Sequence, residues 1–121
     1  MATLLVNTGR AIITSRLNGG GTTPSYIGWG TGAGTTGATD TTLFTEVTPR
    51  TSGTVTQVTT STTNDTFQVV GTQTAATGET ITNAGLFDAS TSGNLFVKGD
   101  FSGIALTTGD SIQFTFKVQF S

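Results

Sequence analysis

The ten residues SIQFTFKVQF, from Ser111 to Phe120, carry the clearest structural signal in the chain. Large apolar side chains alternate with polar ones along the whole segment; the apolar ones are Ile112, Phe114, Phe116, Val118 and Phe120. This period of two places all five on one face of a β-strand. Each such side chain contributes roughly 1.5–3 kcal/mol when it is fully buried. The strand is therefore expected to organise the core, while its polar face meets water or a partner.

Upstream segments also have the composition of strands separated by turns. Threonine makes up about a quarter of the chain, and β-branched residues favour strands. Strands are predicted at 24–30, 54–62, 66–74, 79–89 and 95–101. Residues 38–50 are predicted to be mainly loop, with Leu43, Phe44 and Val47 as apolar anchors. We therefore expect an all-β fold, an antiparallel β-sandwich of two sheets with about seven or eight strands.

One short helix is predicted near the N-terminus, at about residues 7–18. Asn7 can cap it, and Ile12, Ile13 and Leu17 recur at helical spacing. Glycines at 19–21 end it. Two arginines on so short a stripe make a weak membrane binder, so the helix is interpreted as a cover over one end or face of a sheet. With 121 residues, the chain is expected to form a single domain, residues 1–121.

The composition excludes several classes of partner and site. Charged residues make up only 10% of the chain, the net charge is −2, and the basic residues are scattered: Arg10, Arg16, Arg50, Lys98 and Lys117. Without a basic stripe, nucleic-acid binding is not expected. The absence of cysteine excludes disulfides and thiolate metal sites, and it is compatible with folding in a reducing cytoplasm. No apolar run approaches the ~18 residues of a membrane span, so neither a membrane anchor nor an export signal is expected.

The stretch GWGTGAGTTG, residues 28–37, contains the spacing G-x-G-x-x-G at Gly32, Gly34 and Gly37. A dinucleotide site needs a helix directly after these glycines and an acidic residue some 20 positions on, and a P-loop needs a lysine. None of these is present in the sequence. The stretch is therefore predicted to be a glycine-rich loop at about 28–37 that is either mobile or adapts to a neighbouring subunit.

No catalytic, cofactor-binding or metal-binding residue is predicted. The chain has no histidine, the usual general base near neutral pH. Its seven carboxylates mostly lie at turn signals, where aspartate makes local hydrogen bonds: Asp40, Glu46, Asp65, Glu79, Asp88, Asp100 and Asp110. A carboxylate pair at the separation found in glycosidases stays open as an alternative. So does a lectin-like platform of Trp29 and Tyr26, although aromatic residues on a strand beside glycine favour core packing.

Several segments together resemble small virion structural proteins of tailed bacteriophages. The similar segments are the glycine-rich YIGWGTG, the pattern D-T-x-L-x-x-E from Asp40 to Glu46, AGLFD from Ala84 to Asp88, and GDSIQFTFKVQF from Gly109 to Phe120. The likeness extends over nearly the whole chain. It does not separate a capsid cement protein from a tail-fibre or baseplate component.

The resemblance implies a β-rich, non-enzymatic protein located in the virion and assembled in the host cytoplasm. The function expected from it is that of a cement or decoration protein, which binds the outside of the capsid, contacts the major capsid protein and commonly forms a trimer. The alternative is a tail-fibre, baseplate or adaptor component. A surface poor in charge suits either role, because unpaired charges are the costly groups to bury against other subunits.

Overall fold

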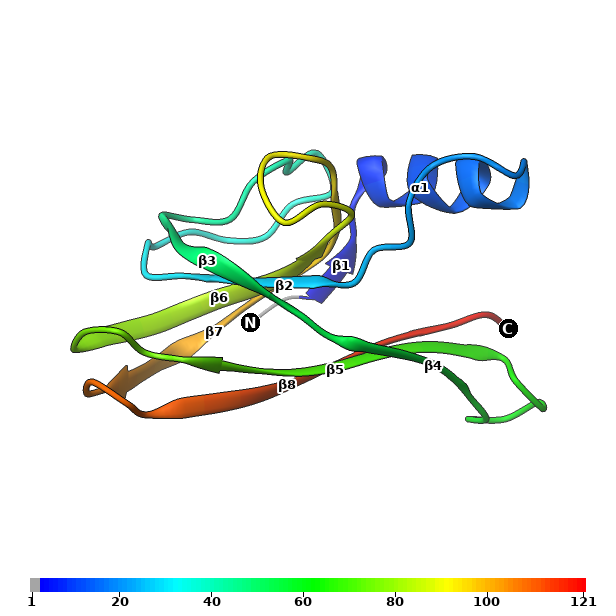
Figure 1. Cartoon of the computed structure of the whole chain (residues 1–121). Helices are drawn as coiled ribbons and strands as arrows, with labels where there is room; N and C mark the ends of the chain where they lie inside the picture. Colours follow the sequence, from blue (N-terminus) through cyan, green and yellow to red (C-terminus); the bar gives the residue numbers. More distant parts are fainter. Residues whose placement is uncertain (1–2) are drawn as a thin grey trace.

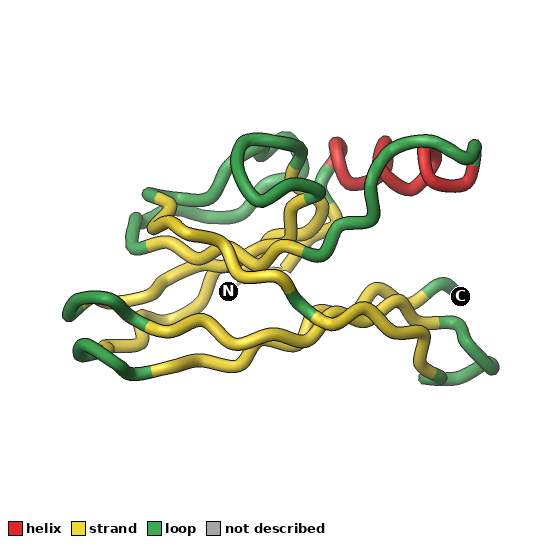
Figure 2. The backbone as a smooth tube through the Cα atoms, viewed as in Figure 1, coloured by secondary structure: helices red, strands yellow, loops and turns green. Residues whose placement is uncertain are grey.

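The computed structural model describes residues 3–121, in which two antiparallel sheets lie face to face with one helix beside them (Figures 1 and 2). The elements are β1 (Thr3–Leu5), α1 (Asn7–Leu17), β2 (Tyr26–Gly30), β3 (Glu46–Ser52), β4 (Thr54–Val58), β5 (Thr66–Thr74), β6 (Glu79–Phe87), β7 (Leu95–Leu106) and β8 (Ser111–Gln119). The larger sheet has the order β1-β7-β6-β2-β3, and the smaller has the order β4-β5-β8. The prediction of an all-β sandwich with one short helix is confirmed.

The strand β8 pairs with β5 along its whole length, from Ser111 opposite Thr74 to Gln119 opposite Thr66. Its apolar face turns toward the larger sheet, as the alternation predicts. These apolar side chains are only half-buried, however, and Phe120 lies beyond the strand with 53% of its surface exposed. The expectation that all five fill the core is wrong, because β8 is an edge strand and its end extends past the larger sheet (Figure 1).

The core between the sheets is formed mainly by β2, β5, β6 and β7. Trp29 is 2% exposed and meets the ring of Phe114 edge-on, with the ring centroids 6.4 Å apart. Nearer the helix, Phe67 and Phe96 make a second edge-on contact at 5.7 Å. Burial of Trp29 agrees with the prediction of core packing, and it removes this side chain from any exposed sugar platform.

The segment predicted as mainly loop contains a strand. β3 runs from Glu46 to Ser52 and continues through Gly53 into β4, so that one stretch of chain crosses from the larger sheet to the smaller (Figure 1). Pro49 lies within β3, although proline is rare inside strands. It is tolerated because β3 is an edge strand that pairs only with β2, so the absent N–H costs no ladder hydrogen bond.

The prediction that Asn7 caps the helix α1 is wrong. Val6 is the N-cap, and Asn7 lies inside the helix, where its side chain accepts a hydrogen bond from Arg10 at 2.8 Å. Gly9 and Ile12 are the buried positions. Gly9 lies so close to the backbone carbonyl of Phe96 that a side chain would not fit, which brings the helix directly against β7. The end of the helix extends beyond this contact.

Candidate interaction surface

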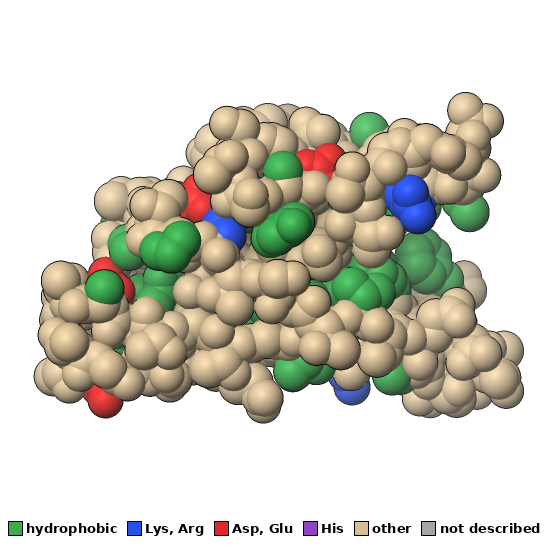
Figure 3. Space-filling model, in the orientation of Figure 1, with side chains coloured by type: hydrophobic (Ala, Val, Ile, Leu, Met, Phe, Trp, Pro, Cys, Tyr) green, Lys and Arg blue, Asp and Glu red, His purple; other side chains and the backbone are tan. Residues whose placement is uncertain are grey.

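An apolar groove of about 430 Å³ opens between the end of α1 and the end of the smaller sheet. Figure 3 shows hydrophobic side chains in the hollow between the helix and the lower layer. The residues that line it come from the helix, from the segment after it, and from β5, β7 and the C-terminus: Ile12, Ile13, Arg16, Leu17, Thr23, Pro24, Phe67, Phe96 and Phe120. The groove thus joins segments from both ends of the sequence.

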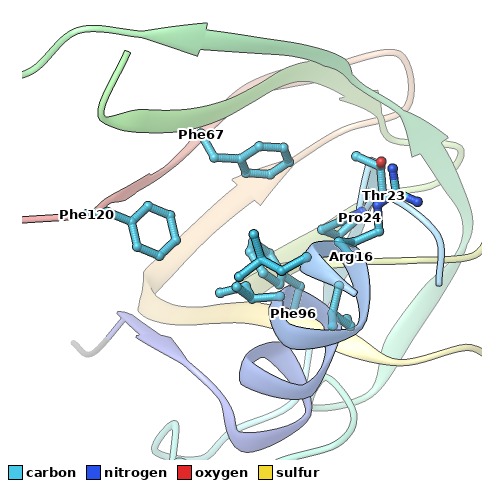
Figure 4. A pocket seen from close by; sticks show the side chains of 9 residues that line it. Arg16, Thr23, Pro24, Phe67, Phe96 and Phe120 are labelled. Atoms are coloured by element: carbon cyan, nitrogen blue, oxygen red, sulfur yellow. The ribbon is translucent and has the colours of Figure 1, made fainter. Parts of the chain in front are cut away.

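The groove exists because the two layers separate where the larger sheet ends. Phe67 and Phe96 meet edge-on at its floor. Phe120 lies on the side of the smaller sheet and Arg16 on the side of the helix (Figure 4). At the rim Leu17 is 83% exposed and Phe120 is 53% exposed. Exposed apolar side chains around an apolar hollow are typical of a surface that another molecule covers.

Arg16 adds one cation to the rim of this groove. Its guanidinium donates hydrogen bonds to the carbonyls of Gly20, at 3.4 Å, and Gly21, at 3.1 Å. These bonds hold the segment that follows the helix, and they leave the positive charge of the side chain at an exposed position. A segment that fits the groove would therefore be apolar, with an acidic group at its edge.

The outer edge of β8 is a second candidate contact. Within residues 3–121 this strand pairs with β5 alone, so its other edge presents backbone N–H and C=O groups along nine residues. Lys117 is the only charged residue in the strand. Free edges of this length pair readily with another strand unless charges, proline or bulges prevent it. The polar face that the sequence suggested for contacts, with Gln113 and Thr115, is exposed beside this edge.

Most of the glycine stretch is packed or hydrogen-bonded, which does not favour a mobile loop, whereas its adaptation to a neighbouring subunit stays a prediction. Its first three residues, from Gly28 to Gly30, belong to β2. The amide of Gly32 donates to the carbonyl of Phe44 at 3.0 Å, and its carbonyl accepts from the hydroxyl of Thr82. A β-carbon on Gly34 would stand 2.7 Å from the ring of Phe44. These glycines serve close packing against the next segment, and no helix follows them.

An aspartate and a buried lysine fasten the loop that follows the glycine stretch. The Nζ of Lys98 donates to Oδ2 of Asp40 and to the carbonyl of Thr42, both at 2.9 Å, and lies 3.3 Å from the centroid of the Phe44 ring. The side chain of Lys98 is 1% exposed and that of Asp40 is 24% exposed. The amide of Gly37 and the ammonium of Lys98 lower the pKa of Asp40.

The other carboxylates of the turns act locally, as predicted. Asp65 accepts backbone hydrogen bonds from residues 60, 61 and 62, which strongly lower its pKa. The backbone amide and hydroxyl of Thr107 likewise lower the pKa of Asp110. Asp88 accepts from the amide of Asn94 at 2.7 Å. The hydrogen bonds of these aspartates hold the turns in place.

Arg50 is also used within the fold. It makes two hydrogen bonds to Glu46, at 2.7 and 3.0 Å, and its guanidinium lies 3.4 Å from the centroid of the Phe87 ring. Two further bonds reach the carbonyls of Ala89 and Ser92. Arg50 and Lys98 are thus not available for a basic surface.

Sequence reasoning missed the groove, which depends on the position of the helix relative to β5 and the C-terminus. Among residues 3–121, no group of three or more side chains of the metal-ligating types comes together. The described part of the chain also has no helix with the length and hydropathy needed to cross a membrane. Comparison of the chain with family models, curated proteins and solved structures gave no match.

Proposed function

We propose that this chain is a non-enzymatic structural protein of a tailed-phage virion, a cement protein that binds the outside of the capsid. The observation that carries the proposal is the open apolar groove between α1 and the smaller sheet, rimmed by the exposed side chains of Leu17 and Phe120. The groove offers an apolar surface on which another protein can bind. The resemblance to virion proteins indicates that this partner is another virion protein. The major capsid protein is the proposed partner.

In this role, an apolar segment of a capsid subunit fills the groove, with an acidic residue beside Arg16. The free edge of β8 pairs with a strand of the same capsid subunit or of a neighbouring subunit. In a trimer, this neighbour is a further copy of the chain. Binding only to the assembled shell stabilises that shell by mass action. Repeated seating on a symmetric surface adds avidity, so each single contact can be modest.

Co-sedimentation of the purified chain with empty capsids tests this proposal. The chain should pellet with the shells, and replacing Leu17 and Phe120 by serine should weaken this at least tenfold. Ile104→Ser is the matched control, because Ile104 is also an exposed apolar residue, at 41%, but lies outside the groove. Equal pelleting of all three proteins would contradict a role for the groove.

A tail-fibre, baseplate or adaptor component is the second candidate, since the sequence resemblance extends to these proteins. The same groove and strand edge would then contact another tail protein. Immunogold labelling of particles separates the two functions, because label on the tail and none on the capsid would overturn the cement proposal and favour this one.

A further inference from the structure

Lys98 is a buried amine that the proposed function does not use. Its side chain is 1% exposed, and its Nζ lies 2.9 Å from Oδ2 of Asp40. The bond to the carbonyl of Thr42 and the ring of Phe44, 3.3 Å away, hold the amine in one position. An amine and a carboxyl group are thus fixed in contact where water reaches only one of them.

We propose that Lys98 and Asp40 become joined by an intramolecular amide bond between Nζ and the carboxyl carbon Cγ. In the neutral pair, the lone pair of Nζ attacks Cγ. A proton then passes from the nitrogen to one carboxyl oxygen, which leaves as water. Ammonium and carboxylate together yield one amide and one water molecule, so atoms and charge balance and no oxidant or other reactant is needed.

The geometry brings the two reacting groups together. Reacting groups that the fold already holds and orients at about 3–3.5 Å react much faster than free ones, and Nζ is in contact with the carboxyl group. Hydrogen bonds from Gly37 and Lys98 lower the pKa of Asp40 overall, whereas desolvation and the charge of Asp100 act in the opposite direction, toward the protonated carboxyl group that the reaction requires. The partial exposure of Asp40, at 24%, gives the departing water a route to solvent.

Asp100 is the candidate that we assign to carry the proton, because its charge acts on Asp40. It lies two residues after Lys98 in β7, and side chains at this spacing are on the same face of a strand. One of its carboxylate oxygens accepts the amide of Thr36 at 3.0 Å. Its negative charge raises the pKa of Asp40, which opposes the lowering by Gly37 and Lys98. Because the ion pair is the resting state, the bond is expected to form slowly after folding.

The bond would fasten the loop after the glycine stretch to β7, across 58 positions of sequence. A chain closed in this way cannot separate these segments even when it unfolds. Its unfolded state is therefore restricted, as with a disulfide, but the link survives reducing conditions.

Mass spectrometry of the full chain tests the proposal. The chain should become lighter by one water molecule during hours to days after purification. Denaturing digestion with trypsin should yield a branched peptide, in which residues 17–50 are joined to residues 51–117 with Lys98 uncleaved. Without the bond, the same digestion yields three separate peptides, 17–50, 51–98 and 99–117.

Three variants sharpen the result. Lys98→Arg keeps the positive charge but lacks the amine that forms the bond, so this variant should retain its full mass. Asp40→Asn should still form the bond and lose ammonia in place of water. Asp100→Asn should fold normally but react at least tenfold more slowly, whereas a merely structural Asp100 would leave the rate unchanged.

Circular dichroism shows whether each variant is folded. A folded wild-type chain that keeps its full mass through prolonged incubation would overturn the proposal. So would a loss of water located outside the peptide that contains Lys98, for example at Asp65, or an equal loss in Lys98→Arg.

Discussion

The aromatic ring of Phe44 lies against the backbone of Gly34, so closely that a β-carbon on Gly34 would stand 2.7 Å from Cζ of the ring. The same ring also contacts the ammonium of Lys98. Phe44 is therefore one link between the glycine stretch and the buried ion pair, beside the hydrogen bond from the amide of Gly37 to Asp40. This position makes the glycine stretch part of the packed structure.

Gly34→Ala should lower the free energy of unfolding by about 1–3 kcal/mol, because the added methyl group forces Phe44 away from its place. Gly37→Ala is the matched control in the same stretch, since its nearest new contact would be an ordinary 3.7 Å, to Asp40. Urea unfolding of both variants checks this. If Gly34→Ala were as well tolerated as Gly37→Ala, the stretch would behave as the mobile loop that was one of the two predictions from the sequence.

Asn83→Ala should destabilise the fold by about 1–3 kcal/mol. Asn83 is fully buried, and its side chain bonds both the amide and the carbonyl of Phe44, at 3.0 and 3.1 Å. The substitution leaves the amide of Phe44 unpaired, at a cost of about 1–3 kcal/mol, whereas the carbonyl of Phe44 keeps the hydrogen bond from the amide of Gly32. Gln113→Ala, on the exposed face of β8, should change stability by less than about 0.5 kcal/mol. Equal unfolding midpoints for the two variants would contradict this role of Asn83.

Stability should fall in acid, and Asp65 should account for part of the loss. Backbone amides of Thr62, Thr60 and Ser61 lower its pKa in the folded chain below the ordinary value of 3.8. A lowered pKa stabilises the folded state above the ordinary value, and this contribution is lost as the pH falls toward the folded pKa. Melting curves between pH 7 and pH 2 should therefore show a smaller acid-induced decrease in Asp65→Asn than in the wild type. An identical pH dependence would refute this assignment.

The single tryptophan provides a direct test of the lectin alternative. Trp29 is 2% exposed and packs against Phe114, so its fluorescence should be blue-shifted and weakly quenched by acrylamide. Added sugars should leave the emission unchanged. Saturable changes on sugar addition, or strong quenching, would show that this ring is accessible.

The strands of the C-terminal half could be predicted because their signals are local. The alternation in 111–120 and the turn residues around 66–74 define β8 and β5 without knowledge of the rest. β3 was missed because residues 38–50 were interpreted as mainly loop, with three apolar anchors and no alternation. The proline within β3 is acceptable only because this strand lies at the edge of the sheet.

The groove and the buried ion pair depend on contacts between distant positions. Phe120 looked like a fifth core residue because alternation shows which face a side chain occupies, not whether a second sheet extends over it. Lys98 did offer one signal, since it follows three apolar residues in LFVKGD. Its partner Asp40 is 58 positions away, and neither periodicity nor spacing connects the two.

The most direct test of the proposed function is the position of this chain in the virion, determined by electron cryomicroscopy of the assembled particle. The proposal predicts density for the two-layer fold on the outer face of the capsid, with the groove beside Leu17 and Phe120 filled by a segment of the major capsid protein. Density for the chain in the tail alone, or a capsid-bound chain whose groove faces solvent, would contradict it.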